Sequence, residues 1–241
     1  MRKSFMAAGA AAIALGAAGV AYAQNPAGSI TGTASVSPTK AGTKSKPKNV
    51  KLTLKVTNDS ASKTTASSIK IKLPSTLKLS TKGLKQCTKS DNVIINQTPA
   101  KACKGSIAGK GTANAVLDPG GQRVPIKFIV TPIVGKNQLL FHLAAQGLAN
   151  KYVLHGKISG KTLTITITKD VQQPITGSPL YSALVDLTST LSLKSGKNYL
   201  LSSTGCSGGK HKIPVTVGYV ANPTPPTKPS ASTTLEAKCS K

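Results

Sequence analysis

The sequence predicts an all-β protein, an antiparallel β-sandwich of Greek-key or jelly-roll-like topology with roughly ten to twelve strands. Apolar and polar residues alternate with period two in many short runs, and turns rich in glycine or proline separate these runs. No segment shows convincing helical periodicity. The chain has 241 residues, which is long enough to bury a substantial core.

The N-terminal region has the three parts of a secretory signal peptide. A charged start, MRK, precedes an apolar stretch up to Val20, and Ala21-Tyr22-Ala23 provides a small-x-small cleavage pattern. The apolar stretch is too short and too weakly hydrophobic to predict a transmembrane anchor. We therefore expect residues 1–23 to be removed on export. Residues 24–241 would then form a single β-sandwich domain, with a flexible N-terminal stretch to about residue 30.

The clearest predicted strand runs from Val50 to Val56. Its even-numbered residues are apolar, whereas Lys51, Thr53 and Lys55 are polar. This alternation is typical of a strand that buries one face only. The same pattern recurs at residues 69–73, 163–167 and 213–219.

Turns and two longer connections separate the predicted strands. The shorter turn signals lie at residues 119–121, 135–137, 159–160 and 208–209. Residues 171–182 are predicted to form a long crossover between strands, as a Greek-key or jelly-roll topology requires. Residues 221–232 form a proline-rich loop before a final strand that carries Cys239.

The chain contains four cysteines, Cys87, Cys103, Cys206 and Cys239. An even number in an exported protein predicts disulfides, and four cysteines allow three pairings. A structural zinc site is disfavoured because the short C-x-x-C spacing is missing. We expect the two pairs that are local in sequence, Cys87 with Cys103 and Cys206 with Cys239.

The stretch CKGSIAGKGT, residues 103–112, looks at first like a phosphate-binding loop. Its two glycines before the lysine are separated by three residues instead of four, and Gly111 stands between the lysine and the threonine. No helix follows that could face a phosphate. We expect instead that Cys103 clamps a loop and that the glycines let a strand depart at close quarters.

Three segments together resemble a group of exported proteins common in actinobacteria. They are SVSPTKAGTKSKPKNVKLTLKV, LPSTLKLSTKGLKQC and ACKGSIAGKGTA, and a late cysteine pair follows them. The similarity covers most of residues 34–117 well and the remainder loosely. It implies a secreted β fold with local disulfides, and it implies no activity.

No catalytic motif or cofactor motif is present, so we predict a non-enzymatic protein without a cofactor. The six carboxylates are isolated from one another in the sequence. His142 and His155 lie on predicted strands that could be adjacent, but ordinary surface or core histidines are favoured over a metal site. The alternative is an exported hydrolase whose site assembles from distant residues. Two carboxylates or a Ser–His pair that converge in a pocket would favour it.

The net charge is the most unusual property of the chain. There are 32 basic and 6 acidic residues, a formal charge of +26, and removal of Arg2 and Lys3 leaves about +24. All the basic residues except Arg2 and Arg123 are lysines. Lysine is a mobile point charge, whereas arginine offers the fork used in specific phosphate recognition. A field made almost entirely of lysine therefore indicates diffuse attraction.

Lys51, Lys55, Lys70 and Lys72 alternate with apolar residues and are predicted to face solvent. One interpretation is that they keep the protein soluble and its sheet edges unpaired. The other is that they bind a polyanion, such as an anionic cell-wall polymer or an acidic polysaccharide. Nucleic acid is disfavoured because the base-stacking aromatic residues are scarce. The leading hypothesis is a secreted, non-enzymatic, lysine-rich protein of the cell envelope or the extracellular space.

Overall fold

The structure is a computed structural model that describes residues 29–58, 65–117, 123–175, 180–220 and 230–241. The predicted signal peptide and most of the expected flexible stretch that follows it lie outside the described residues, as does most of the proline-rich loop.

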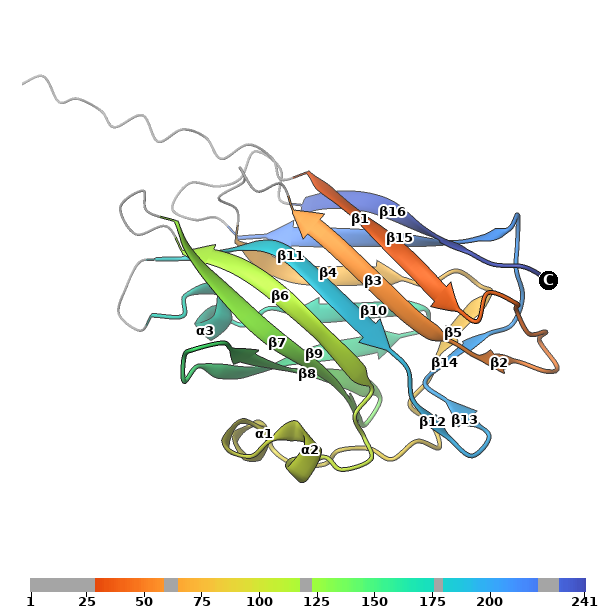
Figure 1. The fold of residues 1–241 in the computed structure, drawn as a ribbon, viewed down its shortest axis with the longest axis horizontal. Helices are drawn as coiled ribbons and strands as arrows, with labels where there is room; N and C mark the ends of the chain where they lie inside the picture. Colours follow the sequence, from red (N-terminus) through yellow and green to blue (C-terminus); the bar gives the residue numbers. More distant parts are fainter. Residues whose placement is uncertain (1–28, 59–64, 118–122, 176–179, 221–229) are drawn as a thin grey trace, which may run out of the picture.

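One antiparallel sheet of eleven strands dominates the described residues (Figure 1). In spatial order its strands are β1 (Ile30–Ser37), β3 (Lys51–Asn58), β11 (Ser182–Leu191), β6 (Gly109–Leu117), β7 (Val124–Gly135), β8 (Gln138–Ala145), β9 (Lys151–Ser159), β10 (Thr162–Thr166), β4 (Ala66–Lys72), β15 (Lys210–Tyr219) and β16 (Ser230–Lys238). The sheet folds over on itself, so that β4, β10, β15 and β16 lie behind β1, β3 and β11 (Figure 1). The predicted all-β, sandwich-like fold is confirmed.

The two edge strands of this sheet, β1 and β16, lie beside each other. A side-chain carbon placed on Gly32 in β1 would lie 3.2 Å from Cδ2 of Leu235 in β16. Just beyond the ends of both strands, the amide of Ala41 donates to the carbonyl of Ser240 at 2.8 Å. The sandwich is therefore nearly closed along this seam.

The topology contains an extended form of the Greek-key pattern. Strands β6 to β10 follow one another as an antiparallel meander, and β11 then returns to pair with β6, the first strand of the meander. The connection from β10 to β11 includes the short helix α3 (Lys169–Gln172) and carries the chain from one layer to the other (Figure 1). It is the crossover expected at residues 171–182.

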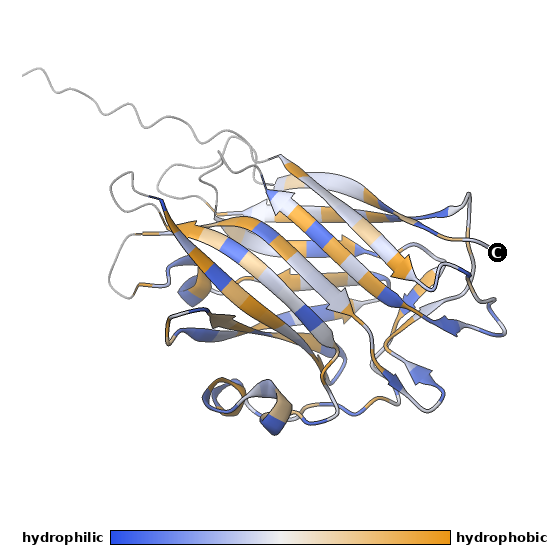
Figure 2. Ribbon diagram, in the orientation of Figure 1, coloured by the Kyte–Doolittle hydropathy of each residue, from blue (hydrophilic) through white to orange (hydrophobic). Residues whose placement is uncertain are grey.

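The core lies between the layers and follows the alternation of the sequence (Figure 2). In β3, Leu52, Leu54 and Val56 are buried, whereas Lys51 and Lys55 are exposed. Burial of such side chains contributes roughly 1.5–3 kcal/mol each. The core cluster takes inward-facing residues from every strand of the large sheet, so the one-face burial predicted from the period-two pattern is confirmed.

The structure also contains elements that the sequence pattern did not predict. Two small sheets are formed by β2 (Lys48–Asn49), β14 (Leu201–Ser203) and β5 (Leu77–Leu79), and by β12 (Lys194–Ser195) and β13 (Asn198–Tyr199). Two short helices are α1 (Asp91–Asn96) and α2 (Pro99–Ala102). Elements of two to six residues are too short to show a period.

The segment that carries α1 and α2 covers the outer face of β7, β8 and β9. Ile94 of α1 is fully buried against Ile133, Leu140 and Val153 in a second apolar cluster. Strand β8 is therefore buried on both faces, which explains its nearly continuous apolar sequence, QLLFHLAA.

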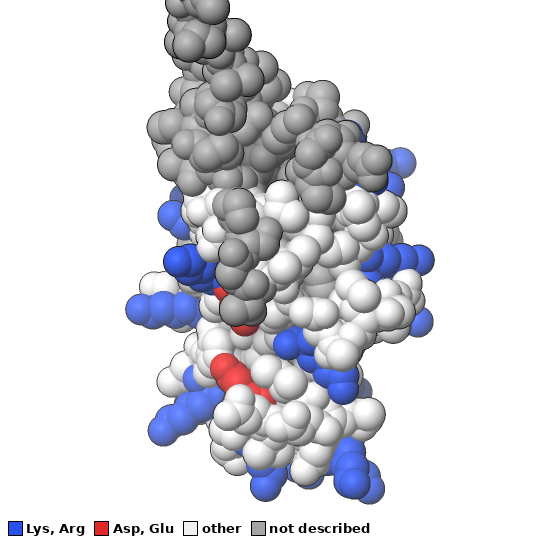
Figure 3. Space-filling view, turned by 90° about the vertical axis from the view of Figure 1, so that its left-hand side faces the viewer, with Lys and Arg blue, Asp and Glu red and all other residues white. Residues whose placement is uncertain are grey.

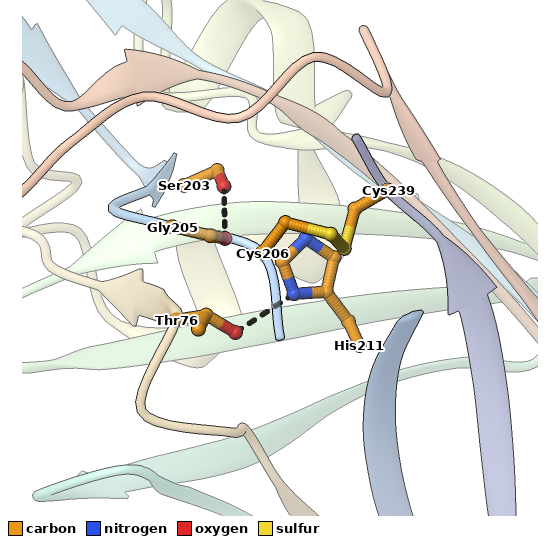
Figure 4. Close-up of a disulfide and its surroundings, with 6 residues drawn as sticks. All are labelled: Thr76, Ser203, Gly205, Cys206, His211 and Cys239. Carbon is orange, nitrogen blue, oxygen red and sulfur yellow. Dashed lines mark hydrogen bonds between the residues drawn. A yellow bond between two sulfur atoms is a disulfide. The ribbon is translucent and has the colours of Figure 1, made fainter. Parts of the chain in front are cut away.

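Both expected disulfides are present, and the described residues include no free cysteine. Cys87–Cys103 closes the α1–α2 segment and belongs to the second apolar cluster. Cys206–Cys239 ties the end of β16 to the turn before β15 (Figure 4).

The glycines after Cys103 have the structural role predicted for them. Strand β6 begins at Gly109 and runs beside β11. A side-chain carbon at Gly109 would lie 1.8 Å from the carbonyl oxygen of Thr190, and one at Gly111 would lie 2.2 Å from that of Thr188. Only glycine permits this close approach of two backbones.

Replacing both cysteines of a pair by serine is expected to destabilise the fold to different extents. Loop-closure entropy gives about 3.1 kcal/mol for Cys87–Cys103 and about 3.7 kcal/mol for Cys206–Cys239, whose sequence separations are 16 and 33. Urea unfolding at constant pH measures both values. Midpoints equal to that of the wild type would contradict the expectation, and non-reducing peptide mapping provides the control on pairing.

Candidate functional site

The four lysines singled out from the sequence are exposed, but they form two separate pairs. Lys51 and Lys55 lie on β3, whereas Lys70 and Lys72 lie on β4. These strands are not neighbours in the sheet, and β4 lies in the layer behind β3 (Figure 1). The four side chains therefore cannot form one continuous patch.

The outer face of β15, β4, β10 and β9, here called the back face, extends the second pair. Along one row of the sheet, Thr216 is opposite Lys70, Lys70 is opposite Thr164, and Thr164 is opposite Lys157. Adjacent strands are about 4.8 Å apart, so Lys70 and Lys157 leave the backbone about 9.6 Å apart. None of the four strands contains an aspartate or a glutamate.

The outer face around β3 has more hydroxyl groups and includes one carboxylate. Lys55 is opposite Thr33 on β1 and Thr188 on β11. The carboxylate is Asp186 of β11, which accepts hydrogen bonds from Nδ2 of Asn114 at 2.9 Å to each oxygen. The strands of the back face contain no carboxylate of their own, but Asp91 of α1 lies beside His155 of β9, and Glu236 of the neighbouring strand β16 pairs with Lys210 of β15.

The histidines considered from the sequence share one face of the sheet without forming a metal site. His142 on β8 is opposite Val153, and His155 on β9 is opposite Leu140, so the two are diagonal neighbours with Cα atoms about 7–8 Å apart. The described residues include no group of three or more potential ligands that could hold a metal ion.

His155 and His142 have different surroundings. The ring of His155 is exposed, with Nε2 2.9 Å from Oδ2 of Asp91 and Nδ1 3.2 Å from Oε1 of Gln138. His142 is buried and its Nε2 has no hydrogen-bond partner. Burial, reinforced by the positive charge of Lys151, lowers the pKa of His142 below 6.5.

A third histidine, His211, is buried near the second disulfide (Figure 4). Its Nδ1 lies 2.8 Å from Oγ1 of Thr76, and its Nε2 has no hydrogen-bond partner. Burial lowers its pKa below 6.5 as well. The ring packs inside the fold and contributes to its core.

An apolar cavity of about 70 Å³ lies between the layers and is called the inner cavity. The strands β4 and β6 to β11, together with α3, contribute its walls. Its lining includes Ala113, Ala115, Phe128, Phe141, Leu154 and Leu184. At about 24 cal/mol per Å³, an empty cavity of this size costs roughly 2 kcal/mol of stability.

A larger hollow of about 450 Å³ opens at the end of the sandwich and is called the end hollow. The ends of β6 and β7, the turn between β8 and β9, and the residues after α3 line it. Its lining includes Leu117, Val124, Phe128, Leu148, Tyr152 and Ile175. No histidine or carboxylate among the described residues lines either cavity.

Neither cavity was predicted from the sequence, although β6 carries one signal for the inner cavity. Two inward positions of β6 that line the inner cavity are occupied by alanines, Ala113 and Ala115. Such small side chains leave space between two layers unless a larger residue opposite fills it, and only the fold shows that none does.

No family model, curated protein or solved structure matches the chain. In the part of the chain that the structure describes, no helix is both long and apolar enough to cross a membrane. The candidate sites of the described residues are the back face and the two cavities.

We expect the stability of the fold to fall as the pH falls below about 6.5. The unfolded chain binds protons on His142 and His211 near pH 6.5, whereas the folded chain binds them only at lower pH, so folding is favoured above this range and opposed below it. Urea unfolding between pH 7.5 and 5 measures the effect. His142→Leu should reduce the loss, and a pH dependence in this variant equal to that of the wild type would contradict the expectation.

Proposed function

We propose that the chain is a secreted, non-enzymatic protein of the cell envelope or extracellular space, held on anionic polymers by its lysines. The observation that best supports this proposal is the back face, where Lys70, Lys72 and Lys157 project from strands that contain no carboxylate. With 32 basic residues against 6 acidic ones, internal ion pairs cannot neutralise the field.

The spacing of these lysines favours diffuse attraction. The separation of about 9.6 Å between Lys70 and Lys157 is close to the Debye length of about 10 Å at 0.1 M salt. A polymer with repeated negative charges would therefore be attracted by several of these lysines at once. At 1 M salt the Debye length is about 3 Å, and the same lysines act separately and weakly.

One structural feature supports an extracellular place for the protein. The two disulfides fit an oxidising compartment. Export itself is inferred from the pattern of residues 1–23 and from the resemblance to exported actinobacterial proteins. Suitable partners are an anionic cell-wall polymer or an acidic polysaccharide.

Replacing Lys51, Lys55, Lys70 and Lys72 by glutamine is expected to lower the salt concentration that elutes the protein from immobilised poly(glycerol phosphate). The side chains face solvent, so the unfolding midpoint should remain close to that of the wild type. A second variant, with Lys70, Lys72 and Lys157 changed to glutamine, tests the back face alone. It should elute at a lower salt concentration than the variant that combines Lys51→Gln with Lys55→Gln.

The matched control replaces the same four lysines by arginine, which preserves the charge. Diffuse attraction predicts elution at the wild-type salt concentration for this control. Elution of the glutamine variant together with the wild type across the whole salt gradient would overturn the proposal and leave the lysines as solubility residues.

A further inference from the structure

We propose that the end of the sandwich binds an anionic amphiphile with a single hydrocarbon chain, of the long-chain fatty acid class. The hydrocarbon chain of this ligand would occupy the end hollow and reach the inner cavity, and its carboxylate would stay at the rim of the hollow. This inference rests on the cavities and is independent of the lysine faces.

The two cavities are adjacent and have the shape of a ligand site. Phe128 lines both of them and packs edge-on against Tyr152, with ring centroids 6.3 Å apart. The end hollow, at about 450 Å³, falls within the range of about 300–1,000 Å³ typical of small-molecule sites. The inner cavity, at about 70 Å³, is large enough only for the end of one chain.

The chemistry of the walls selects a hydrocarbon. The inner cavity is lined by apolar side chains with Ser182 as an exception, and an apolar cavity does not hold ordered water. It exists because β6 presents Ala113 and Ala115 to the larger residues opposite. An apolar chain that entered would regain the contacts that the empty cavity lacks.

The mouth has the exposed apolar residues that a hydrocarbon would cover. Among the described residues, four large apolar side chains are exposed, and three of them, Val124, Leu148 and Ile175, line the end hollow at 45%, 54% and 46% exposure. The fourth, Ile129, lies on the outer face of β7 instead. Exposed apolar residues gathered at one opening mark a binding site more strongly than scattered ones.

The rim offers polar and cationic groups to a carboxylate. Gln146 and Asn150 line the hollow, and Nδ2 of Asn150 donates to the hydroxyl of Tyr152 at 3.1 Å. Lys127 and Lys151 are exposed at outward-facing positions of β7 and β9 next to lining residues, from which their long side chains could reach a carboxylate at the rim, and Asp170 of α3 lies near Tyr152. Figure 3 shows this end of the molecule, with most Lys and Arg at its margins and with acidic side chains nearer its centre.

Binding of hexadecanoate to the purified, oxidised protein, measured by isothermal titration calorimetry below the micellar concentration, tests the proposal. We expect saturable binding with one site per chain. Leu148→Asn should weaken it at least tenfold, because a polar group then lies at the mouth. Ile129→Asn is the matched control, since that side chain is similarly exposed but points to the outer face of β7, away from the hollow, and the affinity of this variant should equal that of the wild type.

Two further comparisons distinguish the contribution of the ligand's hydrocarbon chain to binding from the contribution of its carboxylate. Ala115→Val, with its fold checked by circular dichroism, narrows the inner cavity and should weaken binding of hexadecanoate more than of dodecanoate. Lys127→Gln with Lys151→Gln should weaken hexadecanoate and leave neutral hexadecan-1-ol unchanged. Absence of saturable binding to the wild type would overturn the proposal, as would equal loss in Leu148→Asn and Ile129→Asn.

Discussion

Each strand of the large sheet buries one face against the opposite layer, and the other properties of the molecule depend on this packing. Because the inward residues supply most of the core, the outward residues of strands that no helix covers need only be polar. In β3 and β4 lysine and threonine or serine take these positions without cost to the core. The strong positive charge is therefore compatible with a stable sandwich, since repulsion acts between side chains that point into water.

The same packing is incomplete at one end, and this is where the protein differs from a fully packed sandwich. The glycines of β6 let it approach β11 closely, whereas its alanines, Ala113 and Ala115, line the inner cavity together with Phe128. A protein under selection for stability alone would gain by filling this space. Binding of a hydrocarbon chain, as proposed above, would explain both the inner cavity and the exposed apolar residues at the mouth of the end hollow. It would not explain the lysines on the outer faces.

The fold could be predicted largely from the sequence, and the sites only in part. Alternation at residues 50–56 and 213–219 reports burial directly, and the cysteine pairs expected from their closeness in the sequence, out of three possible pairings, are present. The grouping of Lys70 with Lys157, instead of with Lys51, depends on strand order, which the period of a strand does not encode. Cavities depend on how volumes match across layers, and this too is a property of the folded chain.

The seam between β1 and β16 brings the first described strand against the last one. A chain that is synthesised from its N-terminus therefore cannot close its sandwich until its final residues have emerged. Contacts between such distant segments form slowly, because a long loop must be ordered before they are made. Until then β1 and β3 have an uncovered apolar face, and the mutual repulsion of lysines on the growing chain would help to keep such intermediates apart.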